Sequence, residues 1–535
     1  MLTTVMNLGD LLTQVARRHA DEPGFITSTK THTWGEINKR VDAVCAALRA
    51  QGVKKGDRIM IHSRNNLPLF ESAYIAFKLG AVWVPTNYRV APPEAAYLAK
   101  SSHARVMIYD DGFQHYVDAV REASPALEIV VALGQPRDGE LSYDALIEAG
   151  AQAVGARGFH SEEVERDDPL WFFYTSGTTG YPKAGTLTHG QMAFVVNNHI
   201  ADLMPGITYR SRSLVVAPLS HGAGIHAIVN TARGAASVLP SSDKFDAEDA
   251  WALVEKYKVD NMFTVPTIVK LLTEHESVDR YDHSSLRFVI YAGAPMYRAD
   301  QKHALKKLGK VLVQYYGLGE VTGNITVLPP EMHDADDDTF QKRMGTCGYP
   351  RTGIEIAILD DSGTHQMPFE TGEVCVRGPA VFIGYDNNPD ANDKAFKYGW
   401  FHTGDLGHVD LEGFLYITGR SSDMYISGGS NVYPREVEEA LLMYDGVHEV
   451  AVLGMPDPKW GEYGVAVVVC KGATPPSSEA LLAHLDGRLA RYKWPRKFVF
   501  WDALPKSAYG KITKKDVRAQ LDAMEVGAEP QTVGA

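Results

Sequence analysis

Residues 174–190 read Tyr174-Thr-Ser-Gly-Thr-Thr-Gly-Tyr-Pro-Lys183-Ala-Gly-Thr-Leu-Thr-His-Gly190 and follow directly on the apolar run 170–173. Glycines let such a loop turn its backbone N–H groups inward, while hydroxyl groups and Lys183 add donors for phosphate oxygens. The spacing is not that of a Walker loop, which has four residues between its first Gly and the Gly-Lys pair. Taken alone, a plain surface loop is the competing interpretation. The candidate phosphate-binding residues are Thr175, Ser176, Gly177, Thr178, Thr179, Gly180 and Lys183.

The bulk composition is that of a globular protein with more than one domain. A chain of 535 residues is too long for one compact core. Its formal net charge of −13 argues against a nucleic-acid or anionic-membrane partner. Its four cysteines form no CxxC pair, which predicts a reducing compartment and no structural zinc. No signal core or apolar run of about 18 residues is present, so we predict a cytoplasmic protein without an integral membrane segment.

Several segments repeat one pattern: a short apolar run, a tight turn with Gly or Pro, then a stretch with helical periodicity. Residues 213–218, 259–265 and 288–291 are examples. This alternation predicts an α/β fold with parallel strands, in which ligands bind beyond the carboxyl ends of the strands. The turns, among them Ala292-Gly293-Ala294, are therefore expected to share one pocket.

The pattern changes twice after this region. Short strands at 354–359 and 372–378 predict a small β subdomain. Beyond Gly419-Arg420 we expect a separate small α+β domain, with helices at 434–443 and 478–491 and from 513, and strands at 449–454 and 465–470. The predicted architecture is thus a large N-terminal domain, residues 1–421, of parallel α/β subdomains plus the β subdomain, followed by a C-terminal domain, residues 422–535.

Three further motifs carry chemistry. In Gln314-Tyr315-Tyr316-Gly317-Leu318-Gly319-Glu320, an aromatic ring can stack on a purine, Gln314 can pair with its edge, and Glu320 can hold Mg²⁺ on a polyphosphate. A carboxylate, Asp405, ends the turn 400–405. A lysine, Lys511, ends the run 505–511. Each of these motifs, taken singly, has a plain alternative as a solvated turn or charge.

In this order the motifs resemble those of the adenylate-forming (AMP-binding) superfamily, in its acyl-CoA synthetase or acid-CoA ligase branch. The resemblance covers nearly the whole chain, from the N-terminal helix to Lys511. It implies ATP and Mg²⁺ as cofactors and CoA as co-substrate. It also implies that Lys511, on a mobile lid domain, bridges the carboxylate and the α-phosphate. Two anions repel each other in that reaction, and Mg²⁺, Lys183 and Lys511 would offset the repulsion.

The resemblance implies further roles along the chain. Asp405 and Arg420 would grip the ribose hydroxyl groups, and His221 would border the carboxylate of the acid. Gly428 and Gly429 would line a pantetheine tunnel once the small domain turns about a hinge at Ser422. The nucleotide site would also include Ala292, Gly293, Ala294, Gln314, Tyr315, Tyr316, Gly317 and Gly319.

Two residues depart from the usual pattern of the family. Gly319 stands where Thr or Ser is usual, and losing one neutral hydrogen bond should cost only about 1 kcal/mol. Ser422 stands where the hinge residue is usually Asp or Lys, and its effect on the balance of conformers has no predicted direction.

The predicted acyl pocket is small and apolar, and no Arg for a second carboxylate is evident in it. A monocarboxylic acid with an apolar tail, fatty or aryl, fits it best. Its predicted walls are His221, Ile225, Val265, Ala292, Gly293, Gly317, Leu318 and Val321.

The sequence therefore predicts an ATP-dependent acid:CoA ligase that acts on small molecules: a carboxylic acid, ATP and CoA. Two alternatives stay open, an enzyme that loads a carrier protein and a catalytically idle nucleotide-binding member. The acyl length, the pathway and the oligomeric state, for which a homodimer is one option, are not determined by the sequence.

Overall fold

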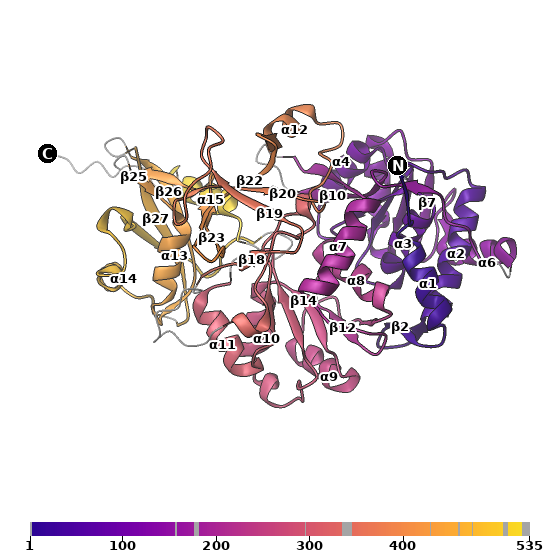
Figure 1. Ribbon diagram of the computed structural model, residues 1–535, viewed down its shortest axis with the longest axis horizontal. Coiled ribbons are helices and arrows are strands. Elements are labelled where there is room, and N and C mark those ends of the chain that lie inside the picture. Colours follow the sequence, from indigo (N-terminus) through magenta and orange to yellow (C-terminus); the bar gives the residue numbers. More distant parts are fainter. Residues whose placement is uncertain are drawn as a thin grey trace.

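The computed structural model describes residues 3–155, 158–175, 181–294, 296–333, 345–427, 430–457, 461–472, 474–506 and 512–526. Figure 1 shows an elongated molecule in which the N-terminal half lies at one end and the C-terminal segment, in yellow, at the other. The predicted α/β class with parallel sheets and a smaller C-terminal part is confirmed.

The first large sheet has seven strands in the order β11-β10-β5-β4-β6-β7-β8. Its neighbours are parallel except β10 and β11, which form an antiparallel pair. The central strands are continuous apolar runs, as expected where helices cover both faces of a sheet. The strands are β4 (Arg58–His62), β5 (Val82–Thr86), β6 (Val106–Tyr109), β7 (Ile129–Ala132), β8 (Leu141–Ser142), β10 (Pro169–Thr175) and β11 (Lys183–Thr188).

The second large sheet also has seven strands, in the order β16-β15-β14-β12-β13-β2-β3, and only β2 and β3 are antiparallel. Three of its strands are the predicted apolar runs that end in Gly or Pro turns, so these turns do lie at one edge. The strands are β2 (Pro23–Ile26), β3 (Thr31–Thr33), β12 (Arg212–Val215), β13 (Ala236–Val238), β14 (Asn261–Thr264), β15 (Phe288–Tyr291) and β16 (Leu312–Gln314).

Helices and short elements pack around and between the two sheets (Figure 1). One two-stranded ribbon joins β1 (Thr4–Val5) to β9 (Val164–Glu165), and another joins β17 (Thr326–Val327) to β18 (Tyr349–Pro350). The helices are α1 (Asp10–Arg18), α2 (Trp34–Ala50), α3 (Leu67–Lys78), α4 (Pro92–Ser102), α5 (Gln114–Ala123), α6 (Tyr143–Val154), α7 (His189–Asp202), α8 (Gly222–Arg233), α9 (Ala247–Tyr257), α10 (Pro266–Glu274) and α11 (Arg298–Leu308).

A small antiparallel sheet follows, as the short strands of the sequence predict. Its central strands β20 and β22 pair from Gly372 opposite Gly407 to Val376 opposite Phe401, with a register shift between Glu373 and Cys375. The elements are β19 (Glu355–Leu359), β20 (Gly372–Arg377), α12 (Pro389–Ala395), β21 (Phe396–Lys397), β22 (Trp400–Val409) and β23 (Leu415–Arg420).

The C-terminal segment builds its own sheet and its own apolar clusters. The prediction of one helix over 478–491 is wrong, because α14 ends at Leu485 and the chain turns at Gly487, whose φ is +73°. The other predicted elements are present. The elements are β24 (Tyr425–Ser427), β25 (Ser430–Val432), α13 (Pro434–Leu442), β26 (Val447–Asp457), β27 (Gly461–Cys470), α14 (Ser478–Leu485), β28 (Lys497–Phe500) and α15 (Lys514–Val526).

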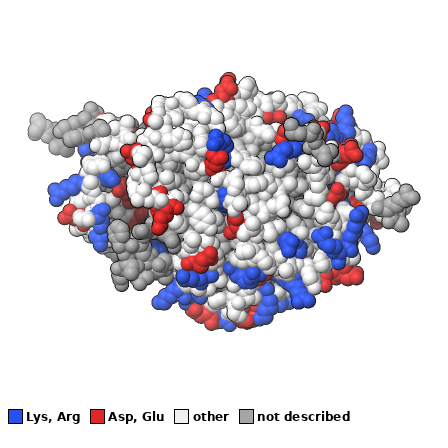
Figure 2. Space-filling view, in the orientation of Figure 1, with Lys and Arg blue, Asp and Glu red and all other residues white. Residues whose placement is uncertain are grey.

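Two surface properties bear on the predicted partners. On the face drawn in Figure 2, basic and acidic side chains lie interspersed, with uncharged surface between them. Among the helices of the described residues, none has the length and apolar character that crossing a membrane requires.

Helices α2 and α6 approach each other closely at Gly150. A Cβ atom placed there would lie 1.8 Å from the carbonyl oxygen of Ala43. We predict that Gly150→Ala destabilises the protein by about 1–3 kcal/mol, because this overlap outweighs the helix propensity of about 1 kcal/mol that Ala gains over Gly. Denaturant unfolding followed by circular dichroism measures the change. Gln152→Ala on the exposed face of α6 is the control, and an unchanged Gly150→Ala would contradict the close packing.

Candidate active site

The buried carboxylate of Glu320 joins three segments that are far apart in sequence. Its Oε1 accepts hydrogen bonds from the hydroxyl groups of Thr175 at 2.8 Å and Tyr385 at 2.9 Å. Its backbone carbonyl accepts the N–H of Phe382 at 2.7 Å. Burial and the neighbouring Glu320 charge raise the pKa of Tyr385, so this hydroxyl stays protonated and donates.

The antiparallel pair β10 and β11 brings Lys183 to the same place. Lys183 lies opposite Thr175 in the register of the two strands, and its Nζ is 5.2 Å from the centroid of the Tyr385 ring. Tyr385 is held there because it bridges to Gly185 of β11. The structure thus groups Thr175, Lys183 and Glu320 as one site, whereas Ser176, Gly177, Thr178, Thr179 and Gly180 lie outside the described residues.

Gly319 has no room for a side chain. A Cβ atom placed there would lie 2.5 Å from Cδ1 of Phe173 and 2.9 Å from Cγ2 of Thr175. The Phe173 ring also packs against His221, with 4.4 Å between ring centroids. The departure at Gly319 is therefore matched by the large side chain of Phe173, which occupies the space that a hydroxyl-bearing residue would need.

A second group is centred on the buried carboxylate of Asp405 in β22. Tyr316 donates its hydroxyl to Oδ2 at 2.7 Å, and Arg420 of β23 donates Nε–H to Oδ1 at 3.1 Å. Burial and the Asp405 charge raise the pKa of Tyr316. Three of the predicted nucleotide residues, Tyr316, Asp405 and Arg420, are thereby brought together.

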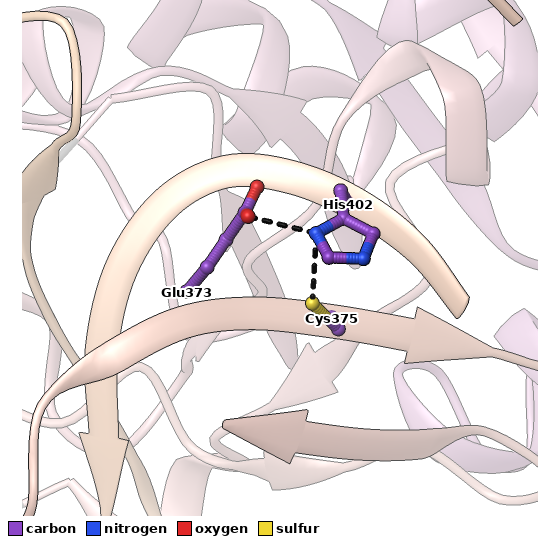
Figure 3. Close-up of side chains that lie close together, drawn as sticks. All are labelled: Glu373, Cys375 and His402. Carbon is purple, nitrogen blue, oxygen red and sulfur yellow. Dashed lines mark hydrogen bonds and ion pairs between the residues drawn. The ribbon is translucent and has the colours of Figure 1, made fainter. Parts of the chain in front are cut away.

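The turn that carries Asp405 is held by residues that the sequence analysis did not identify. As Figure 3 shows, Glu373 and Cys375 of β20 face His402 of β22, whose Nδ1 lies 2.7 Å from Glu373 Oε2 and 3.4 Å from Cys375 Sγ. The other Glu373 oxygen accepts the N–H of Gly404 at 2.9 Å. The three ligand atoms lie within 4.8 Å of one another, as a metal ion would need. The carboxylate is nevertheless occupied by His402 and Gly404, and burial raises the pKa of the Cys375 thiol to about 12.

The other predicted nucleotide residues lie at the ends of β15 and β16. Gln314 accepts a hydrogen bond from the hydroxyl of Tyr291 at 3.0 Å, whereas Tyr315 is buried with its ring stacked on Phe263. Ala292 is buried and donates its N–H to the carbonyl of Thr264, while Gly293 is exposed and Ala294 half-buried. Gly317 is half-buried between the two groups.

The predicted acyl-pocket residues lie on elements that meet beside Phe173. His221 precedes α8, and Ile225 is buried within that helix. Val265 precedes α10 and is half-buried, as is Leu318, while Val321 is fully buried in the core. Within the described residues these side chains form a packed region between α8 and the ends of β14, β15 and β16.

The hinge and lid residues are described only in part. Ser422 is exposed and donates its hydroxyl to Asp423 at 3.2 Å. Helix α13 contacts the preceding part of the chain, since Arg435 donates to the carbonyl of Ile417 at 3.0 Å and Glu439 accepts the N–H of Arg298. Gly428, Gly429 and Lys511 lie outside the described residues.

Tyr385, Glu373, His402 and Phe173 were missed by the sequence analysis. Their roles depend on strand register and on a bridge between distant segments, for which the sequence offers no local signal.

Comparison with known proteins identifies the family of the chain. Residues 12–386 match the model of the AMP-binding enzyme family, and residues 436–511 match that of the AMP-binding enzyme C-terminal domain. The chain is 34% identical over 495 residues to a feruloyl-CoA synthase of an Amycolatopsis species, covering 91% of this chain and 94% of the relative. It is also 34% identical over 493 residues to a long-chain-fatty-acid–CoA ligase of Mycobacterium tuberculosis, with 92% and 93% covered.

Among solved structures, the anthranilate CoA ligase AuaEII in complex with anthranoyl-AMP superposes with a TM-score of 0.88 at 26% identity, covering 98% of this chain and 99% of that one. The chain therefore belongs to the AMP-binding enzyme family, in the acyl-CoA synthetase branch of the adenylate-forming enzymes.

Proposed function

We propose that the protein is an ATP-dependent acid:CoA ligase that forms acyl-AMP and pyrophosphate, then acyl-CoA and AMP. The observation that carries this proposal is the buried Glu320 carboxylate beside Thr175 and Lys183, close to the end of the phosphate loop. The sequence order of the motifs and the family membership support it.

In the first step, an oxygen of the acid's carboxylate attacks the α-phosphorus of ATP, and the bond to the β-phosphate oxygen breaks to release pyrophosphate. Negative charge gathers on the phosphates, so cations near them lower the barrier. We assign this role to Lys183 and, from the lid, to Lys511. In the second step the CoA sulfur attacks the acyl carbonyl carbon, the bond to AMP breaks, and the thiol proton leaves to solvent.

The residues around Glu320 fit a Mg²⁺ ion bound with the polyphosphate. Both hydroxyl donors contact Oε1, and no described residue donates to Oε2, which leaves a carboxylate oxygen of the kind Mg²⁺ prefers. When bound, the ion would neutralise phosphate charge. Thr175 and Tyr385 fix the orientation of the Glu320 carboxylate by their hydrogen bonds to Oε1.

We assign the nucleoside to the second group. Asp405 has lone pairs beyond those used by Tyr316 and Arg420, so it can accept the ribose hydroxyl groups. Tyr316 bonds to Asp405, and we assign the base to Tyr316 and Gln314 together with the turn 292–294. Glu373 and His402 position the Asp405 turn through the Gly404 N–H.

For the acid, we propose a monocarboxylate with an apolar body, fatty or aryl, bordered by His221. We assign CoA as the acceptor because of the branch of the family, and we propose that Gly428 and Gly429 line a pantetheine tunnel once the lid turns at Ser422. Loading of a carrier protein remains the alternative acceptor chemistry, and an idle nucleotide-binding member the non-enzymatic one. The domain boundary after residue 421, the cytoplasmic location and a homodimer stay predictions.

The first test is pyrophosphate release with Mg-ATP across straight-chain, branched and aryl acids, with and without CoA. We expect CoA-dependent turnover, and a loss of about 10²–10³-fold in the first half-reaction for Lys511→Ala, because a cation that meets the transition-state charge is removed. An equal rate of pyrophosphate release with and without CoA would favour a carrier-protein acceptor. ATP binding without release for any acid would establish the idle member.

Glu320→Gln tests the carboxylate at the centre of the site. The amide oxygen can still accept the two hydroxyl groups, so we expect an unchanged thermal midpoint, but loss of the charge should lower the adenylation rate about 10²-fold. Pyrophosphate release and thermal unfolding measure the two effects, with the exposed Glu331→Gln as control. Equal loss of stability and activity would instead indicate a purely structural carboxylate.

Gly319→Ser, which restores a hydroxyl usual in the family, should lower activity in this chain. Its Cβ would overlap Phe173 and disturb the Thr175 contact with Glu320, at a cost of about 1–3 kcal/mol. We expect adding Phe173→Ala to recover part of the loss by making room. Rates of pyrophosphate release for the two single variants and the double variant decide this, and a more active Gly319→Ser would refute the steric argument.

A further inference from the structure

Arg351 follows β18 and is buried without a hydrogen bond for its guanidinium. Its exposed fraction is 1%, and Nε, Nη1 and Nη2 have no partner among the described residues. The nearest carboxylate oxygen of an ion-pair partner, Oδ2 of Asp202, is 3.9 Å from Nε, beyond hydrogen-bond reach. That carboxylate is already bonded by Asn198 and by the N–H and hydroxyl of Thr352.

Such a group is costly to leave unbonded. A guanidinium has five N–H donors and no acceptor, and burying donors without partners is unfavourable by far more than an average hydrogen bond contributes. Burial lowers the pKa of Arg351 only to about 10, so the group is charged at neutral pH. The site therefore needs an acceptor that the described residues do not supply.

Near Arg351, four aromatic side chains contact one another in turn, so that each contacts two of the others. Ring centroids are 5.9 Å apart for His199 and His226, 6.1 Å for His226 and Phe263, 5.9 Å for Phe263 and Tyr315, and 6.2 Å for Tyr315 and His199. The Arg351 charge contributes to lowering the pKa of His199, after burial, and it opposes the rise in the pKa of Tyr315. Both side chains thus lie within the field of the guanidinium.

Several other polar atoms in this region are also unbonded. Both ring nitrogens of His199 and Nδ1 of His226 are buried without a partner in the described part of the chain. The same holds for both side-chain polar atoms of Asn324, whose neighbour Ile325 accepts the backbone N–H of Arg351. Buried polar atoms normally have partners, so a cluster of unbonded ones needs partners from outside the described residues, either buried water or a bound molecule.

Residues of this cluster lie within one or two positions of predicted acyl-pocket residues along the chain. His226 follows Ile225 in α8, Phe263 precedes Val265 by two residues, and Tyr315 precedes Gly317 by two. If the proposed function is correct, the carboxylate of the acid lies near His221 and its tail extends toward this cluster.

The charge balance around Arg351 determines which kind of hydrogen-bond acceptor can bind there. Asp202 already balances the charge of Arg351, so a second buried carboxylate would leave a net negative charge in the interior, which is costly. A carbonyl or hydroxyl oxygen would accept from the guanidinium without adding charge. We propose that Arg351, with His199 beside it, forms the far end of the acyl site and binds a neutral oxygen acceptor carried at the distal end of the acid.

The test compares acids of equal size that differ only in this group. We would measure kcat/KM for pyrophosphate release with oxo and unsubstituted fatty acids, with 4-acetyl- and 4-ethyl-substituted phenylpropanoic acids, and with dicarboxylic acids. We expect the chain to favour the ketone of a matched pair by about tenfold or more, because the apolar partner leaves the guanidinium unbonded. Moving the ketone along a chain of fixed length should give one preferred position.

Arg351→Met should remove this preference, lowering the ketone-to-methylene ratio about tenfold or more while keeping turnover of apolar acids. Arg280→Met, an exposed arginine, is the matched control and should leave the ratio unchanged. If Arg351→Met does not fold, the position scan on the unaltered chain decides: a flat profile overturns the proposal, and a single preferred position supports it.

The remaining outcomes distinguish a failure of this inference from a failure of the proposed function. Turnover with equal kcat/KM for ketone and methylene acids overturns this inference and leaves the ligase standing. Preference for a dicarboxylic acid over the ketone contradicts a neutral acceptor. Silence with every acid despite ATP binding overturns the proposed function, and this inference with it.

Discussion

Thr175 and Tyr385 both donate to one oxygen of Glu320, and the other groups of the site are arranged around that buried carboxylate. A buried charge is tolerated only when it is bonded, so the three segments that meet at Glu320 are fixed relative to one another. The antiparallel pairing of β10 with β11 meets the same constraint, because it sets Lys183 opposite Thr175. Residues 384–386 then run along β11 and bring Tyr385 to the carboxylate.

The parts of this arrangement that could be predicted from sequence are those with local signals. Apolar runs followed by Gly or Pro turns located β12, β14 and β15, and the motif residues Lys183, Glu320, Asp405 and Arg420 were identified from their order along the chain. The helix expected to reach 491 ended at Leu485 because its periodic pattern continues through a turn at Gly487, which periodicity does not reveal. Tyr385, Glu373 and His402 depend on which strands pair and in which register, and no local pattern encodes that.

Gly319 departs from the family pattern, and its neighbours in the structure explain why a residue without a side chain stands there. In the sequence it is a missing hydroxyl, worth about one neutral hydrogen bond. In the structure it is the small member of a size-matched pair, because Phe173 fills the space above it and also packs on His221. Since a single ring contacts both positions, the space beside Gly319 and the space beside His221 are coupled through Phe173.

The contact between α13 and the rest of the chain bears on the lid movement in the proposed reaction. Among the described residues, hydrogen bonds from Arg435 to Ile417 and from Arg298 to Glu439 are among the links between the parts. Each contributes about 0.5–1.5 kcal/mol net, because water replaces a broken partner. Such contacts can be exchanged for others at little net cost, so we expect the proposed lid movement to respond to what is bound. The hydroxyl of Ser422, the predicted hinge residue, bonds only to its neighbour Asp423 among the described residues, so it supplies no contact that would favour either position in the proposed lid movement.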